Sequence, residues 1–240
     1  MNEPNYGSRL RIGMMMPCRN TVAEPDARAL LPRGVSLHAT RLRLMGTSRE
    51  ELMAMTRDVE TAAELLAAAK MNLLAFHCTA ASTLDADLGA DVVARIERST
   101  GIKATATSEA LLAALAVLKA KRIVMVSPYK QHINDSEVAF FAQHGIDVLD
   151  EKGLALPDAE TMSAVTPDEW YRETMALRRD DADAYFLSCT NIRALPAIER
   201  LEQALQKPVI SSNQAMIWHC LRTAGLDDVI PGYGRLLRSH

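Results

Sequence analysis

The stretch "LLAFHCT" (residues 73–79) returns later in the chain as "AYFLSCT" (residues 184–190), so that Cys78 and Cys189 lie 111 positions apart. The segments "IGMMMP" (12–17) and "IVMVSP" (123–128) are separated by the same 111 positions. Two further matches, described below, occur in the same order along the chain. The four matches together indicate a duplicated structural unit. We therefore predict two similar halves of about a hundred residues each, an ordinary size for a domain.

Short apolar runs alternate with longer amphipathic stretches, a pattern typical of an α/β protein with mostly parallel sheets. Helices are expected at residues 49–70, where Ser48 is the N-cap and Glu51 completes a capping box, and at residues 108–120. Ligands of such sheets bind outside the carboxyl ends of the strands. The expected strands are "RIGMMMP", "VSLHATRLRL", "NLLAFHC", "RIVMVSP", "IDVLDE", "AYFLSC" and "PVISS".

The repeat also predicts how the chain divides. "VSLHATRLRL" falls on the segment from Ile146 at the common offset, whereas "ATSEALLAAL" (106–115) matches "SNQAMIWHCL" (212–221) at 106 positions. We expect these last helices to cross between halves, with a first lobe of residues 1–106 and 213–240 and a second lobe of residues 107–212. The predicted fold is two pseudosymmetric Rossmann-like lobes with an active-site cleft between them, where Cys78 and Cys189 face each other.

Composition limits the classes of partner. The 240 residues are 48% hydrophobic and 24% charged, and a net charge of −3 provides no basic field for nucleic acid. No apolar run approaches the roughly 20 residues of a membrane span, and the amino terminus lacks a secretory leader. We expect a cytoplasmic protein, without membrane or nucleic-acid partners, that forms a homo-oligomer. Its cysteines are expected to be thiols: Cys18, Cys78, Cys189 and Cys220.

The paired cysteines are the strongest candidates for chemistry. A buried free cysteine is commonly a packing residue, but both Cys78 and Cys189 end apolar strands, precede a threonine and recur at the repeat offset. One thiolate can add to or deprotonate a carbon while the other thiol protonates it from the opposite face. Backbone N–H groups of helices starting near Thr79 and Thr190 are expected to lower the thiol pKa and to bind a substrate carboxylate.

Further candidates lie beside these strand ends. Asn20 follows the first strand and is interpreted both as a helix cap and as a carboxylate ligand. Tyr129 follows the first strand of the second half, 111 positions after Cys18, and is expected to hydrogen-bond the substrate. His77 and Ser188 precede the cysteines, so strand alternation directs them to the opposite face of the sheet. No metal or cofactor motif occurs, and Pro17 and Asn191 complete the predicted substrate site.

These segments carry a family resemblance: "IGMMMPCRNTVAEPD" (12–26), "AFHCTAAS" (75–82), "FLSCTNIRALPAIERLE" (186–202) and "KPVISSNQA" (207–215). The chain resembles the aspartate/glutamate racemase superfamily, in particular the branch of maleate cis-trans isomerase and arylmalonate decarboxylase. The resemblance implies a two-lobed α/β fold without metal or organic cofactor. It also implies a small dicarboxylate, or a related carboxylic acid, as the substrate.

Carried over to this chain, the resemblance implies that Cys78 adds as a thiolate to a cis double bond and that Cys189 acts as acid and base. Asn20 and Tyr129 are then implied to contact the substrate carboxylates, with Thr79 and Thr190 as further donors. The decarboxylases have a glycine in place of Cys78, which favours an isomerase. An amino-acid racemase of the aspartate/glutamate type, an arylmalonate-type decarboxylase and a non-catalytic metabolite-binding protein stay open as alternatives.

Overall fold

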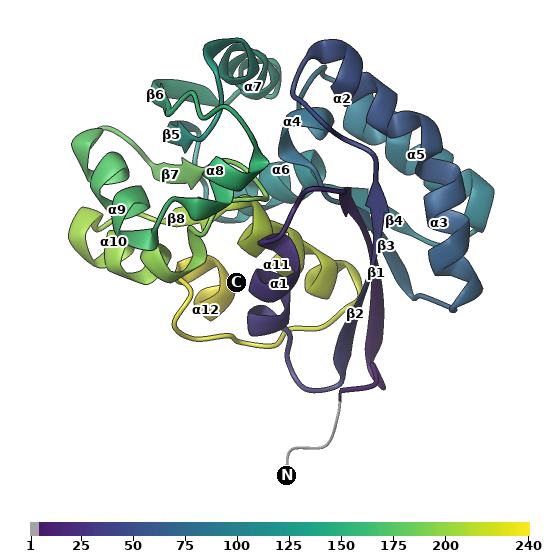
Figure 1. Cartoon of the computed structure of the whole chain (residues 1–240). Helices are drawn as coiled ribbons and strands as arrows, with labels where there is room; N and C mark the ends of the chain where they lie inside the picture. Colours follow the sequence, from purple (N-terminus) through teal and green to yellow (C-terminus); the bar gives the residue numbers. More distant parts are fainter. Residues whose placement is uncertain (1–4) are drawn as a thin grey trace.

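The computed structural model describes residues 5–240 as two α/β lobes that lie side by side (Figure 1). Each lobe contains one four-stranded sheet in which every neighbouring pair of strands is parallel. The strands are β1 (Leu10–Pro17), β2 (Val35–Leu42), β3 (Leu73–Phe76) and β4 (Ala104–Ala106) in the first sheet, and β5 (Arg122–Ser127), β6 (Asp147–Gly153), β7 (Ala184–Leu187) and β8 (Val209–Ser211) in the second.

The two sheets repeat each other in order and in register. The strand order is β2-β1-β3-β4 in the first sheet and β6-β5-β7-β8 in the second. Met15 of β1 is paired with Phe76 of β3, and Val126 of β5 is paired with Leu187 of β7, so both partners move by the 111 positions of the repeat. The prediction of two similar lobes with parallel sheets is confirmed.

Helices cover the sheets and fill the space between the lobes. Figure 1 shows the helices that follow the fourth strand of each sheet near the middle of the molecule, and these two helices pack against each other. Because both lie at this junction, the assignment of each helix to one lobe stays a prediction. The helices are α1 (Ala23–Leu30), α2 (Arg49–Met55), η1 (Thr56–Asp58), α3 (Val59–Ala68), α4 (Thr79–Ser82), α5 (Leu88–Thr100), α6 (Thr107–Val117), α7 (Gln131–Gln143), α8 (Ala159–Ala164), α9 (Pro167–Ala176), η2 (Leu195–Ala197), α10 (Ile198–Leu205), α11 (Ser212–Thr223) and α12 (Arg235–Ser239).

Local signals account for some element boundaries and not for others. The capping box of Ser48 and Glu51 at the start of α2 is confirmed. The expected single helix of residues 49–70 is wrong in detail, because the η1 turn separates α2 from α3. A helix starting near Thr190 is also wrong: a turn at residues 190–191 leads into irregular structure, and helical structure starts only at η2. Strand β4 was not anticipated, since three residues carry no periodicity.

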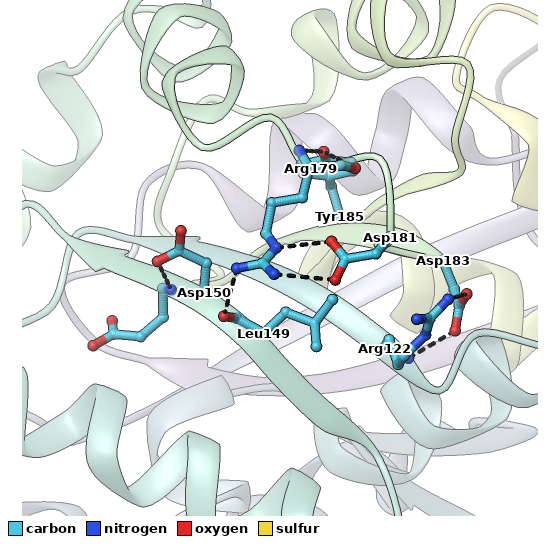
Figure 2. A network of polar contacts seen from close by, with 8 residues as sticks. Arg122, Leu149, Asp150, Arg179, Asp181, Asp183 and Tyr185 are labelled. Atoms are coloured by element: carbon cyan, nitrogen blue, oxygen red, sulfur yellow. Dashed lines mark hydrogen bonds and ion pairs between the residues drawn. The ribbon is translucent and has the colours of Figure 1, made fainter.

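A polar network lies at the amino ends of β5 and β7, at the opposite end of the second sheet from the cysteines (Figure 2). The Arg179 guanidinium donates to both Asp181 oxygens, at 2.9 and 3.0 Å. The Asp183 carboxylate accepts the backbone N–H of Arg122 at 2.8 Å, and the Tyr185 hydroxyl donates to the Arg179 carbonyl at 3.2 Å. These contacts connect the segment before β7 to the start of β5, and thereby help to set the register of the two strands.

Among residues 5–240, no helix combines the length and the apolar character that crossing a bilayer requires.

Candidate active site

A cavity of about 90 Å³ lies where the carboxyl ends of the two sheets meet. Cys78 lies two residues after the end of β3, and Cys189 lies two residues after the end of β7. Each lobe therefore contributes one thiol to the cavity. The size of the cavity limits its ligand to a small molecule. Seven of the eight predicted site residues line it: Pro17, Asn20, Cys78, Tyr129, Cys189, Thr190 and Asn191.

Thr79 is the exception, because its side chain is fully buried behind the cavity. Its hydroxyl donates to Ser212 Oγ at 2.8 Å. The same Ser212 oxygen accepts the backbone N–H of Cys189 at 3.2 Å. Thr79 therefore connects the segments of the two cysteines through the first residue of α11. It supports the site from behind and does not line the cavity.

Both cavity thiols are buried, and burial controls their acidity. It raises the pKa of Cys78 to about 12, although a hydrogen bond from the Ala81 backbone acts in the opposite direction. It raises the pKa of Cys189 to about 11, against hydrogen bonds from Tyr129 and the Asn191 backbone. The predicted lowering of the thiol pKa is therefore wrong in direction, because the loss of hydration of a thiolate outweighs the few backbone donors at these strand ends.

Tyr129 and Asn191 hold the Cys189 sulfur. The Tyr129 hydroxyl hydrogen-bonds the thiol, and burial raises the pKa of this phenol well above its usual value, so Tyr129 stays a proton donor. The backbone N–H of Asn191 donates to Cys189 Sγ at 3.2 Å. Two donors aimed at one sulfur stabilise its thiolate, which is the form that Cys189 takes once it has given up a proton.

Asn20 has the capping contacts predicted for it, whereas its role as a carboxylate ligand stays a prediction. Its Oδ1 atom accepts the backbone N–H groups of Val22 at 3.0 Å and Ala23 at 2.9 Å, which caps the start of α1. Its Nδ2 atom donates to Thr190 Oγ1 of the other lobe at 2.9 Å. The amide is thus held by three contacts while it faces the cavity, so that its position is set before a ligand enters.

Asn191 forms a second bridge between the lobes. Its Oδ1 atom accepts the backbone N–H of Thr21 at 3.0 Å, and its Nδ2 atom donates to the Ala159 carbonyl at 2.8 Å. Together with the Asn20 to Thr190 bond, these contacts join the loops after β1, β6 and β7 around the cavity.

His77 and Ser188 point away from the thiols, as strand alternation predicts. The ring of His77 contacts Thr107 Oγ1 at 3.1 Å and Asn213 Oδ1 at 2.9 Å. Burial lowers the pKa of His77 to about 4, and this imidazole is accordingly neutral near pH 7. Ser188 Oγ donates to Glu137 Oε1 at 2.9 Å. Neither side chain pairs with a cysteine.

Sequence reasoning missed much of the cavity wall. Arg19 lies beside Asn20, and its Nη1 atom donates to the Met45 carbonyl at 3.2 Å. Asp158 faces it from the other lobe and caps α8 by accepting the Thr161 N–H at 2.9 Å. The position of these two residues in loops after β1 and β6 was the available signal. The remaining missed residues are mainly apolar: Leu44, Met45, Gly46, Thr47, Leu52, Ala80, Pro157, Ala159 and Met162.

Within residues 5–240, no group of three or more His, Cys, Asp or Glu side chains is arranged to hold a metal ion. The chemistry of the site is that of two thiols, one phenol, two amides and two threonine hydroxyls, with one guanidinium and one carboxylate on the wall.

Fold and site together define a two-lobed α/β protein with a small cavity that is lined by one cysteine from each lobe. The chain belongs to the arylmalonate decarboxylase family, whose model matches residues 12–237.

The relatives include isomerases and a decarboxylase. A maleate isomerase of Pseudomonas putida is 28% identical over 241 residues, which cover 95% of this chain and 96% of the relative. Arylmalonate decarboxylase of Bordetella bronchiseptica is 28% identical over 231 residues, with 94% and 95% covered. A solved structure of a cysteine-to-serine mutant of Nocardia farcinica maleate cis-trans isomerase, with a covalently bound succinylcysteine intermediate, has a TM-score of 0.92 at 25% identity and covers 96% of this chain and 99% of that one. The resemblance expected from the sequence is confirmed.

Proposed function

We propose that this chain is a cofactor-independent cis-trans isomerase of a small unsaturated dicarboxylate of the maleate type. The observation that carries the proposal is the placement of Cys78 and Cys189 at equivalent strand ends on one small cavity. The isomerase relatives, which span nearly the whole chain, support the same reaction.

The proposed reaction uses the two thiols in turn. The cycle starts from the Cys78 thiolate, whose proton has passed to solvent water. Its sulfur forms a bond to one carbon of the double bond while Cys189 transfers a proton to the other carbon. The former double bond is now a single bond and rotates. Cys189, as a thiolate held by Tyr129, takes a proton back from the same carbon, and the bond from carbon to the Cys78 sulfur breaks to release the trans isomer. Atoms and charge are the same at the end as at the start.

Asn20, Thr190 and Asn191, together with Tyr129, are the proposed carboxylate ligands, because their neutral polar side chains line the cavity and come from both lobes. Charge-assisted hydrogen bonds of this kind contribute about 1.5–3 kcal/mol each. Asn20 and Thr190 are held by their mutual hydrogen bond. Asn191 is held by its contacts with backbone groups, and this preorganisation reduces the entropy lost on binding.

Proton NMR of the purified protein with maleate tests the reaction directly. Fumarate is expected with the unchanged protein and with Cys18→Ser, whose thiol is exposed and does not line the cavity. None is expected with Cys78→Ala. Fumarate formation by Cys78→Ala would contradict the nucleophile assignment, and its absence in the unchanged protein would contradict the substrate.

A decarboxylase or racemase reaction is the second candidate, favoured by the family model and by the Bordetella bronchiseptica relative. Release of CO₂ from an arylmalonate would support a decarboxylase. Exchange of the Cα proton of aspartate or glutamate in D₂O, with loss of optical rotation, would support a racemase. The presence of Cys78 favours the isomerase over the decarboxylase, because the resemblance implies a glycine there in decarboxylases.

We further infer a cytoplasmic location and a homo-oligomer. A mechanism with two free thiols requires a reducing compartment, which supports the location. Sedimentation velocity at micromolar concentration tests the oligomer, and a single species of monomer mass would contradict it.

A further inference from the structure

A fully buried carboxyl group lies behind the turn that carries Cys189. Glu137, in α7, is 0% exposed. Its Oε1 atom accepts the Ser188 hydroxyl at 2.9 Å, and within residues 5–240 its Oε2 atom has no hydrogen-bond partner. The reaction proposed above makes no use of this group.

The surroundings of Glu137 suit an acid that keeps its proton. An ionised carboxylate accepts up to four hydrogen bonds, whereas in the described part of the chain only one donor reaches Glu137. A buried charge without compensating partners costs far more than a buried neutral acid. Burial, together with the nearby Glu151 carboxylate, raises the pKa of Glu137 to about 8, against the Ser188 hydrogen bond.

Through Ser188, Glu137 supports a strained piece of backbone. Cys189 has a φ of +126°, a value that residues with a side chain rarely adopt. On the strand side, the Ser188 N–H donates to the Val126 carbonyl at 2.8 Å. The Glu137 carboxyl holds the Ser188 side chain from the face opposite the cavity, and this fixes the residue from which the strained turn begins.

The other lobe holds its cysteine differently. Asp26, in α1, lies 111 positions before Glu137, just as His77 lies 111 positions before Ser188. The shorter Asp26 side chain reaches His77 only through Asn213, whose Nδ2 donates to Asp26 Oδ2 at 2.8 Å. Direct contact between a buried acid and the residue before the cysteine is therefore specific to the second lobe.

We propose that Glu137 is a positioning residue that holds the Cys189 turn as an uncharged carboxylic acid, and that loss of its proton disables the proton-transfer half of the site. This inference rests on the isomerase function proposed above. The titratable groups that face Glu137 are Glu151 of β6, Tyr129 after β5, Cys189 after β7 and Cys78 after β3. All four are acids, so an added negative charge at Glu137 makes each thiolate harder to form.

The dependence of kcat/KM on pH in Glu137→Gln tests the proposal, because glutamine keeps the shape and the acceptor for Ser188 but cannot ionise. Thiolate formation is expected to increase the rate about tenfold per pH unit below the thiol pKa. In the unchanged protein this increase is expected to flatten above pH about 8, whereas in Glu137→Gln it is expected to continue, with KM changed less than kcat. The matched variant Asp26→Asn should still flatten. Identical profiles for the unchanged protein and Glu137→Gln would overturn the proposal.

Two further measurements need no substrate and separate this inference from the isomerase function. Infrared spectroscopy of the unchanged protein should show a buried carboxylic-acid band at pH 7 that disappears with a midpoint near pH 8. Its absence at pH 7 would overturn the proposal even where Glu137→Gln fails to fold. In a Cys18→Ser background, the rate of Cys189 alkylation, followed by peptide mass mapping, should flatten above the same pH. If both results appear without maleate turnover, the isomerase function fails and the role of Glu137 stands.

Discussion

Cys78 and Cys189 follow equivalent strands, yet their backbones adopt different conformations, with φ of −152° at Cys78 and +126° at Cys189. The second value lies where a side chain collides with its own backbone, at a cost of about 1–3 kcal/mol. Contacts from Ser212 and Asn191 hold the residue there. The duplicated fold therefore offers two chemically alike thiols in two different backbone settings, which suits one nucleophile and one proton carrier.

The strain at Cys189 predicts an unusual order of stability. Cys189→Gly should be more stable than Cys189→Ala by about 1 kcal/mol, because relief of the strain exceeds the roughly 0.5–1 kcal/mol of backbone entropy that glycine costs. At Cys78, whose φ is ordinary, Cys78→Gly should be less stable than Cys78→Ala. Urea denaturation gives the four free energies of unfolding. The same order at both positions would contradict the strain at Cys189.

Removal of the proton carrier should trap the reaction halfway. In Cys189→Ser, the hydroxyl does not ionise near pH 7 and cannot take the proton back from the adduct. An adduct of one substrate molecule on Cys78 is therefore expected to accumulate, and turnover to fall by at least about 10³-fold. Intact-protein and peptide mass spectrometry after incubation with maleate locate the adduct. Modification of Cys18 or Cys220 in place of Cys78 would show that the nucleophile is misassigned.

Asn20 has a capping role and a proposed binding role, which two substitutions separate. Asn20→Ala removes both, and should lower the free energy of unfolding by about 1–3 kcal/mol through the lost cap and the unpaired Thr190 hydroxyl. Asn20→Asp keeps the capping oxygen but brings negative charge to the cavity. It should lose less stability than the alanine variant while KM rises at least about tenfold. An unchanged KM would exclude carboxylate binding by Asn20.

The Arg19 guanidinium is expected to bind the negatively charged substrate. In the described part of the chain it is the one basic side chain that lines the cavity. Loss of a charged hydrogen bond of about 1.5–3 kcal/mol predicts roughly 10- to 100-fold weaker binding of maleate to Arg19→Met. Calorimetry in a Cys78→Ala background measures this without turnover. Arg43→Met, which removes a neighbouring cation outside the cavity wall, is the control, and equal effects of the two variants would assign the result to long-range charge.

The raised thiol pKa values predict how activity depends on pH. With pKa values of about 12 for Cys78 and about 11 for Cys189, thiolates are scarce at pH 7 and become more abundant as pH rises. Therefore kcat/KM, which reports the free enzyme, should increase close to tenfold from pH 6 to pH 7, below the range in which Glu137 ionises. Initial rates at low substrate concentration in buffers of constant ionic strength measure this. A profile that is already flat at pH 7 would show that a thiolate forms in the free enzyme.

Much of the site was accessible from the repeat. Because parallel strands of equivalent order end at equivalent places, two cysteines 111 residues apart had to reach the same edge of two similar sheets. Alternation along the strands correctly directed His77 and Ser188 away from the cavity. These are local or symmetric properties, and they follow from the chain's own pattern.

What only the tertiary structure decided depends on contacts between segments far apart in sequence. The way the lobes meet buries the thiols, which raises their pKa values, and places Thr79 against Ser212. It also brings Arg19 and Asp158 to the cavity wall. The sequence by itself determined the duplicated α/β fold and the pair of thiols, since these depend on periodicity and order. The strained Cys189 turn and its buried Glu137 support required the folded chain, because desolvation and backbone strain are set by every neighbour at once.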